Sequence, residues 1–424
     1  MLIEQRGSLR GEVKVPGDKS ISHRAILFGS LAKGTTEIDG FMMGEDCLCT
    51  IDCFRKMQVS IEILPNNKIK IQGNGLYGLK PPKTQLNAGR SGTALRLLLG
   101  VLSGQPFSSV VTRNESALRK PVGKVVVPLR EMGANISGRE NGNLCPLSIT
   151  PSKLSGKTHS ISILDTYIKS PLLIAGLYAD GETTVIEEAK SRDHSELMLN
   201  YFGADIRVNG LEVTSHRVEN LFAQHIQIPG DISIAAYFIT AGLIVPNSDI
   251  VIKDVGINPT RAGILEVYKS MGAHIELLNQ RTVNNEKIAD IRVVSSPLKG
   301  TTIEGDIIPR LIDEIPIITV AATMAEGTTT IKNLNGFKTK EFGKLKKMLT
   351  ELSKLGATVE ETDDGAIIEG KGALKGTIVE GYNDAAITMS LCIAGLAAAE
   401  ETTIRKTQIL DIVYPDFIPV LNKL

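Results

Sequence analysis

The chain has 424 residues with 47 Lys+Arg and 47 Asp+Glu, so its formal net charge is zero. At roughly 100–200 residues per domain, the length predicts two or three domains. The balanced charge and the 4% aromatic content argue against nucleic acid as a partner, because phosphates attract basic surfaces and bases stack on aromatic rings. The sequence contains no apolar run of the roughly 18 residues that a membrane span needs, and its polar N-terminus is not that of a signal peptide. Five cysteines, a low and odd number, fit a reduced cytoplasmic protein rather than a disulfide framework.

Six segments of the chain share one plan: a turn, an apolar helix, a second turn and a β-branched strand. The first and fourth begin almost identically, with PGDKSI and PGDISI, which indicates two halves of three units each. We therefore predict a first three-unit domain over residues 18–228 and a second one formed by residues 1–17 and 229–424. The six segments begin at Pro16, Gly89, Asp165, Pro229, Pro309 and Asn383.

A second helix follows in most units and ends in Gly-Ala before a β-branched run. The glycine of this pair is typical of the position just after a helix, where a left-handed backbone is needed. Each unit should therefore carry two helices and about four strands. The glycines are Gly133, Gly203, Gly272 and Gly356.

The first helix of every unit is apolar on nearly all sides, as in AILFGSLA and ALRLLLGVL. Such a helix must be buried all round, so we expect an inside-out α/β (α+β) arrangement with helices inside and sheets outside. The positive N-terminal ends of these helices would then face a cleft between the halves and attract an anionic small molecule.

Four motifs, VPGDKSISHRA, SRDHSE, PRLIDE and the pair Lys340-Glu341, occur in this order along the chain. Together they resemble the enolpyruvyl transferase family, and within it the EPSP synthases of Gram-positive type. The resemblance implies two domains, each an inside-out barrel of three βαβαββ units. It also implies condensation of shikimate 3-phosphate with phosphoenolpyruvate, release of phosphate, and no metal or organic cofactor. We expect a monomer with its active site in the cleft between the two domains.

The motif for the ring substrate is intact. By resemblance, Ser20 and Arg24 hold the ring carboxylate, and Lys19 is a catalytic residue between the two substrates. Ser191 and Lys340 match positions that contact the phosphorylated ring. Two further residues in the altered third-unit segment, discussed below, are also assigned to this subsite, namely Thr166 and Tyr167.

The acid–base carboxylates of the family are present as Asp313 and Glu341. Asp313 lies in an apolar run, where an unpaired carboxylate is costly to bury, so we expect it to be functional or paired. Gly92 and Thr93 match the turn at the phosphoenolpyruvate pocket.

Departures from the family pattern gather around phosphoenolpyruvate. By comparison with the family, two asparagines are replaced by Arg90 and Gly336, and two arginines by Lys120 and Lys344. The triplet that binds phosphate in the family is Asp165-Thr166-Tyr167 here, the His-Arg pair is Ala385-Ala386, and a lysine near the C-terminus is Ile412. Phosphoenolpyruvate carries two anionic groups that suit forked arginine contacts, which lysine does not provide. The losses could cost on the order of 5 kcal/mol, and Asp165 should add repulsion. The sequence therefore argues against phosphoenolpyruvate as a substrate. The altered pocket is at most a second anion site and comprises Arg90, Gly92, Thr93, Lys120, Asp165, His194 and Lys344.

Three functions remain open. The first is ordinary carboxyvinyl transfer, the second is elimination of water or phosphate from a shikimate-type ring by a divergent homologue, and the third is non-enzymatic binding. The retained Lys19, Asp313 and Glu341 argue against a mere binder, and Ala385-Ala386 argue against the ordinary transferase. We favour elimination. His23 and His194 are interpreted mainly as structural, and the spacing in CLCTIDC does not fit a zinc site.

Overall fold

The computed structural model describes residues 1–334, 336 and 339–424, with the backbone alone described at 339–341. The chain forms two compact units. Unit 1 comprises Met1–Pro16, Pro229–Thr282 and Lys287–Leu424, and unit 2 comprises Gly17–Ile228 and Val283–Glu286. Each unit is described by itself below.

The apolar helices form the centre of each unit, as the sequence predicts. Eleven of the 13 residues of the first one are buried, and 12 of the 13 residues of its counterpart in the other unit. In unit 2 these helices are α1 (Lys19–Leu31), α3 (Gly92–Ser103) and α6 (Lys169–Gly176), and in unit 1 they are α8 (Ile232–Ile244), α10 (Ile315–Met324) and α12 (Ala385–Ala397).

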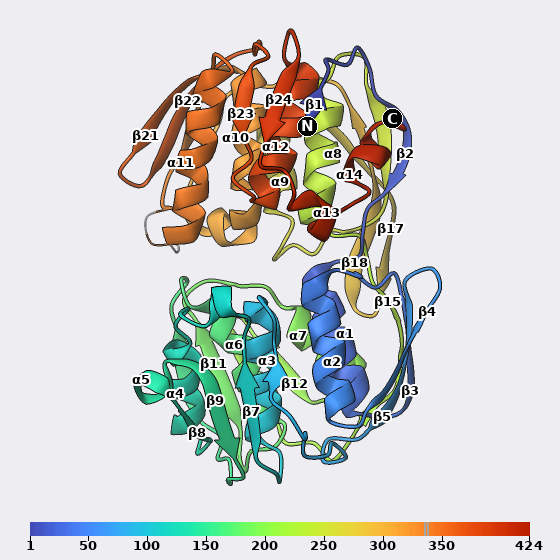
Figure 1. Ribbon diagram of the computed structural model, residues 1–424, viewed down its shortest axis with the longest axis vertical. Coiled ribbons are helices and arrows are strands. Elements are labelled where there is room, and N and C mark those ends of the chain that lie inside the picture. Colours follow the sequence, from blue (N-terminus) through green and yellow to red (C-terminus); the bar gives the residue numbers. More distant parts are fainter. Residues whose placement is uncertain (335, 337–338) are drawn as a thin grey trace. The chain divides into compact units, whose positions relative to one another are not determined.

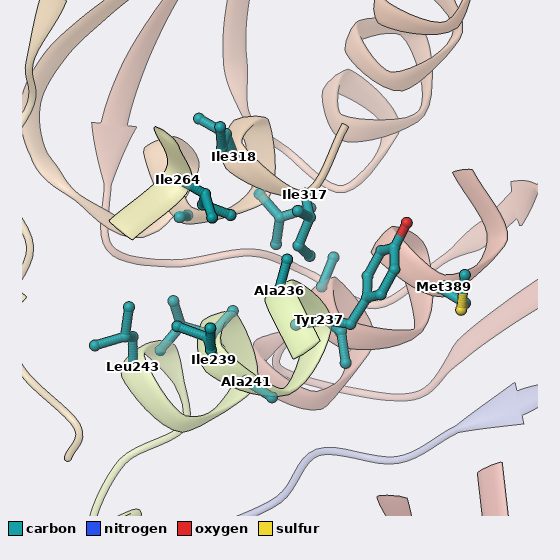
Figure 2. Close-up of a cluster of buried hydrophobic side chains, with 14 of the residues drawn as sticks. Ala236, Tyr237, Ile239, Ala241, Leu243, Ile264, Ile317, Ile318 and Met389 are labelled. Carbon is teal, nitrogen blue, oxygen red and sulfur yellow. The ribbon is translucent and has the colours of Figure 1, made fainter. Parts of the chain in front are cut away.

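Within each unit the three helices pack against one another. Helix α3 contacts both α1 and α6, and α8, α10 and α12 contact one another in pairs. Figure 2 shows part of the unit 1 core, where Tyr237 and Ile239 of α8 lie near Ile317 of α10 and Met389 of α12. Because apolar side chains point outward from all faces of these helices, the helices are stable only in this enclosed position.

Side chains cap four of these helices at their N-termini. Asp18 accepts from the Ile21 N–H at 2.8 Å, and Ser91 accepts from the Ala94 N–H at 3.1 Å. Asp231 and Asp384 do the same for α8 and α12. Helices α6 and α10 have no such cap and follow directly on the short 3-10 turns η2 (Thr166–Ile168) and η4 (Ile312–Glu314).

The strands form six sheets in the described part of the chain, three in each unit. Those of unit 2 are β3 (Ala32–Asp39), β4 (Ser60–Leu64), β5 (Lys68–Asn74), β6 (Leu86–Asn87), β7 (Ser109–Thr112), β8 (Asn135–Gly138), β9 (Leu144–Thr150), β10 (Thr158–Ile161), β11 (Thr183–Glu187), β12 (Ile206–Asn209), β13 (Glu212–Ser215), β14 (Leu221–Phe222) and β15 (His225–Gln227). Those of unit 1 are β1 (Leu2–Ile3), β2 (Arg10–Lys14), β16 (Asp249–Gly256), β17 (His274–Val283), β18 (Glu286–Val294), β19 (Thr302–Ile303), β20 (Glu326–Ile331), β21 (Thr358–Thr362), β22 (Gly365–Lys371), β23 (Ile378–Glu380) and β24 (Thr402–Arg405).

One strand order recurs in these sheets. In the order β6-β7-β9-β8, the first pair is parallel and the next two pairs are antiparallel. The orders β10-β11-β13-β12 and β19-β20-β22-β21 repeat it. A parallel pair needs a crossover segment, and a core helix supplies it in each repeat. Figure 1 shows β3 and β5 beside α1, and β7 and β9 beside α3, so the sheets cover the helices.

The first repeat of each unit borrows its parallel strand from a distant part of the chain. Strand β2 pairs in parallel with β16, with Arg10 opposite Asp249. Strands β14 and β15 pair in parallel with β3. The N-terminal residues thus belong to the sheet of the fourth repeat, whereas residues 221–227 complete that of the first.

The remaining helices include the second helix of most repeats, which connects two strands of the same sheet. The four predicted glycines each follow such a helix with positive φ, from 79° at Gly272 to 104° at Gly133, as the sequence predicts. None of the helices in the described part of the chain is both long and apolar enough for a membrane span. The helices outside the two central groups of three are α2 (Glu45–Lys56), η1 (Glu115–Ala117), α4 (Gly123–Glu131), α5 (Arg139–Gly142), α7 (His194–Tyr201), α9 (Gly263–Ser270), η3 (Gly305–Arg310), α11 (Thr339–Lys354), α13 (Leu410–Val413) and α14 (Phe417–Leu421).

Candidate active site

Arg24 on α1 is the centre of the predicted ring site in unit 2. The residue is only 8% exposed, yet two hydroxyl groups and a backbone carbonyl, and not carboxylates, accept its hydrogen bonds. Nε donates to Ser195 Oγ at 2.7 Å, Nη2 donates to Ser170 Oγ at 2.9 Å, and Nη1 donates to the Ser20 carbonyl at 3.0 Å. The guanidinium is thus oriented without being neutralised by direct hydrogen bonding, which suits a residue that binds a carboxylate.

A buried ion cluster lies next to these hydroxyl groups in the chain. Lys169 at the start of α6 is 1% exposed, and its Nζ lies 3.1 Å from Glu187 Oε1 and 2.6 Å from Glu196 Oε1. Glu187 accepts the N–H of Ser191 at 3.2 Å and also its hydroxyl. Burial raises the pKa of Glu196 despite the charge of Lys169. This cluster therefore fixes the position of Ser191. It also connects to Arg24 through the chain, because Lys169 directly precedes Ser170, which accepts a hydrogen bond from Arg24.

His23 ties three helices together. Its Nδ1 lies 2.8 Å from Thr50 Oγ1 of α2, and its Nε2 lies 3.3 Å from Ser91 Oγ, the cap of α3. Burial, and to a smaller extent the nearby Lys19 charge, lower the pKa of His23 to about 3. The imidazole is therefore neutral at pH 7, and the structural interpretation of His23 holds.

Lys19 begins α1 with a side chain that is 42% exposed and paired with Asp46 of α2. The cysteines next to this pair belong to α2, where Cys47 and Cys53 are buried. Burial raises the pKa of Cys53 to about 12, so its thiol is inert at neutral pH. Among the described residues there is no group of three or more His, Cys, Asp or Glu placed to hold a metal ion.

The expected repulsion from Asp165 is wrong, because its charge is neutralised inside the unit. Lys124 Nζ donates to both of its carboxylate oxygens, at 2.8 and 2.9 Å, and Tyr167 OH donates to Oδ1 at 3.1 Å. Burial alone would raise the pKa of Asp165, but the hydrogen bonds of Lys124, Ser162 and Tyr167 outweigh it and lower the pKa. The partner, Lys124, lies 41 residues away in sequence.

The Tyr167 ring stacks under a second arginine. Arg96 of α3 lies 4.9 Å from the ring centroid, a cation–π distance. Burial, and to a smaller extent the neighbouring Asp165, raise the pKa of Tyr167 to about 12. Thr166 and Tyr167 form the turn η2 directly before α6. Arg96 links this turn to the start of α3, because its side chain lies over the Tyr167 ring and also beside Gly92.

His194, predicted in the altered pocket, forms a buried ion pair. It is 2% exposed at the start of α7, and its Nδ1 lies 2.6 Å from Oε1 of Glu286, in the Val283–Glu286 segment that belongs to unit 2. Burial alone would lower the pKa of His194, but the charge and hydrogen bond of Glu286 outweigh it and raise the pKa. Lys120, by contrast, is exposed in the loop after η1.

In unit 1, Asp313 is accessible to solvent and lies beside an arginine. Its side chain is 41% exposed at the turn before α10, and Arg261 Nη2 lies 3.7 Å from it. The buried carboxylate is the next residue, Glu314, which is 1% exposed and accepts two hydrogen bonds of 2.9 Å from Arg261 Nη1. Of two adjacent acids in an apolar run, one is thus paired in the core and the other is accessible to solvent.

The other predicted residues of unit 1 lie at helix starts. Asp384 caps α12, with Ala386 N–H at 3.0 Å and Ile387 N–H at 3.2 Å, so the Ala pair occupies the first turn of this helix. The remainder comprise Lys344, partly exposed on α11, Gly336 in an exposed turn, Ile412, 50% exposed on α13, and Lys340 and Glu341 in the first turn of α11, whose side chains lie outside the described residues.

A separate cavity of about 490 Å³ in unit 2 is lined by none of the predicted residues. Gln105, Lys153, Tyr178 and Arg217 are among the side chains around it. Several predicted residues of unit 2 instead lie in the N-terminal turns of α1 and α3 or in the turn before α6, and the hydrogen bonds of Arg24 and Ser91 connect these three helix starts.

The model of the family "EPSP synthase (3-phosphoshikimate 1-carboxyvinyltransferase)" matches residues 3–421 of the chain. The chain belongs to this family. A 3-phosphoshikimate 1-carboxyvinyltransferase of Thermoanaerobacter sp. (strain X514) is 49% identical over 422 residues, covering 100% of this chain and 99% of the relative. That of Brevibacillus brevis is 46% identical over 422 residues, with the same coverage. The solved EPSP synthase from Acinetobacter baumannii has a TM-score of 0.93 at 39% identity and covers 100% of this chain and 97% of that chain.

Membership of the EPSP synthase family changes the preferred function. Relatives that are nearly half identical along the whole chain are named carboxyvinyltransferases, and nothing in these comparisons supports the elimination reaction that the departures suggested. The roles of Lys19, Asp313 and Glu341 stay predictions. The sequence reasoning missed Lys169, Ser170 and Ser195, although a Lys and a Ser in an apolar helix start are an available signal of buried function.

Proposed function

We propose that this protein transfers the carboxyvinyl group of phosphoenolpyruvate to a hydroxyl of shikimate 3-phosphate and releases phosphate. In this reaction the hydroxyl oxygen bonds to the carbon that carries the phosphate, the bond from that carbon to the phosphate oxygen breaks, and the hydroxyl proton is lost. A base must take this proton, and an acid assists the departing phosphate. By family resemblance these roles fall to Asp313, Glu341 and Lys19.

The observation that carries the proposal is the full-length similarity to carboxyvinyltransferases, at 49% identity for one of them. The geometry of unit 2 supports it, since Arg24 is held by Ser170 and Ser195 in an orientation that can bind a carboxylate. The cluster of Lys169 with its two glutamates keeps the surrounding turns in place.

The departures from the family pattern argue less strongly against the binding of phosphoenolpyruvate than the sequence alone suggests. Lys120 and Lys344 retain a positive charge, although not a forked one. Asp165 is neutralised by Lys124 and does not oppose an anion with a full charge. We therefore expect phosphoenolpyruvate to bind through charge with fewer forked contacts, and the substitutions to affect its affinity more than the chemistry.

The test is a phosphate-release assay with shikimate 3-phosphate and phosphoenolpyruvate, together and singly. We expect turnover on the order of 10 s⁻¹ with both substrates and none with either alone. Lys19→Met should abolish turnover, whereas Lys157→Met, which changes an exposed lysine of the same unit, should not. Loss of phosphate or water from the ring substrate alone would refute the proposal and restore elimination.

A further inference from the structure

Arg113, directly after β7, is a buried cation that the predicted site does not include. The residue is only 7% exposed. Its Nη2 donates to the carbonyl of Arg90 at 3.0 Å, and its Nε is buried with no hydrogen-bond partner among the described residues. A buried N–H without an acceptor is costly, and a charged one more so, so each such group in a folded protein needs an explanation.

The surroundings of Arg113 are those of an anion site. Arg90, to which it is bonded, lies in the turn before α3, a 12-residue helix whose first N–H groups and positive dipole end favour an anion. Gly92 opens the helix, and a Cβ at this position would lie 3.0 Å from Arg96 Nη1, so the Arg96 side chain folds back over the same turn. Two arginine side chains, those of Arg96 and Arg113, therefore approach one helix N-terminus, where Arg90 contributes its carbonyl group.

The charges near this turn are unbalanced. Burial, together with the charges of Arg113 and Arg24, lowers the pKa of Arg96 to about 10, although the Tyr167 phenol opposes this. Burial also lowers the pKa of Arg113, and the groups that act against this are the Cys145 thiol and Asp46. Asp46 is already paired with Lys19. A cluster of cations with this little opposing charge is stabilised when an anion binds.

We propose that Arg113 is a specificity-determining residue that, with the N-terminal turn of α3, binds the phosphate of the co-substrate. The inference rests on the proposed function, because that reaction requires a phosphorylated co-substrate. Arginine suits a phosphate through its planar, forked donors. In this chain Arg113 thus adds a charge at the turn of Gly92 and Thr93, while lysines stand at two positions where the family has arginine.

A purely structural role for Arg113 would be to brace the Arg90 turn through Nη2. Two variants separate the alternatives. Arg113→Gln keeps an N–H donor for the Arg90 carbonyl but loses the charge, and Arg113→Lys keeps the charge but loses the fork. The control is Arg207→Gln, since Arg207 is an exposed arginine of the same unit that pairs with Asp205.

The experiment measures kcat and the KM of each substrate, and the melting temperature with and without inorganic phosphate. We expect R113Q to raise the KM for phosphoenolpyruvate by about 10-fold or more, the effect of losing one charge-assisted hydrogen bond. R113K should fall between R113Q and the wild type, and the KM for shikimate 3-phosphate should change by less than about 2-fold. R207Q should behave as the wild type.

Two outcomes would overturn the inference. One is an unchanged KM for phosphoenolpyruvate in R113Q. The other is an equal rise of both KM values with a lower melting temperature, which is the signature of a brace. The phosphate measurement separates the inference from the proposed function. If the wild type shows no transfer but phosphate raises its melting temperature and not that of R113Q, the transferase proposal fails and the anion site stands.

Discussion

Replacing Lys169 by methionine tests whether charge, rather than packing, holds the ring site together. Methionine is similar in length and leaves little empty space, but it removes the cation that lies 3.1 Å from Glu187 and 2.6 Å from Glu196. Glu187 would keep the N–H of Ser191 as a donor. Glu196 would lose its counter-ion at a position where burial already raises its pKa.

The magnitude follows from the protonation of Glu196. A buried carboxyl without a counter-ion takes up a proton instead of staying charged. Its ordinary pKa is 4.5, so protonating it at pH 7 costs about 3.4 kcal/mol at about 1.4 kcal/mol per pH unit. In the variant the folded-state pKa of Glu196 is raised, and the cost of keeping this carboxyl protonated in the folded state grows as the pH rises. K169M should therefore lower the free energy of unfolding by about 3–4 kcal/mol at pH 7 and by about 1 kcal/mol at pH 5.

Urea unfolding followed by circular dichroism at pH 5, 6 and 7 measures this dependence. The control is Lys157→Met, which changes an exposed lysine of the same unit and should leave stability within about 0.5 kcal/mol at each pH. The double variant K169M/E196Q should recover most of the loss at pH 7, since an amide needs no counter-ion. An equal loss at pH 5 and pH 7 would contradict this reasoning and assign the effect to packing.

Two other predictions concern the same scaffold. Glu286 raises the pKa of His194, so this pair gives stability that is present below pH 6.5 and lost as the pH rises through the folded-state value; E286Q should flatten the fall in unfolding free energy between pH 6 and 9. Gly73→Ala should destabilise by about 1–3 kcal/mol, because a Cβ there meets two backbone carbonyls at the end of α1. Its matched control, Gly343→Ala, has open space around the Cβ on a helix and should stabilise by up to about 1 kcal/mol in the same urea experiment.

The sequence alone determined the helices and their burial, because local chemistry decides both. A helix such as α8 is apolar on every face, and only an enclosed position satisfies it. Gly133 and Gly272 marked helix ends because a left-handed backbone favours glycine whatever surrounds it. The position of Arg24 at the start of α1 also followed from its motif, and the motif order was sufficient to recognise the family.

The tertiary structure alone decided which charges are paired. From the sequence, Asp165 is expected to repel an anionic substrate, but in the structure Lys124, 41 residues away, donates a hydrogen bond to its carboxylate. Asp313 and Glu314 are adjacent acids in one apolar run, but only Glu314 is buried, where it accepts hydrogen bonds from Arg261, 53 residues away. Ion pairs and buried donors depend on distances between segments that are remote in sequence, and electrostatic energies change steeply over a few ångströms. A local pattern carries no such distances, so the ion partners of Lys169 and the contacts of Arg113 could be established only from the fold.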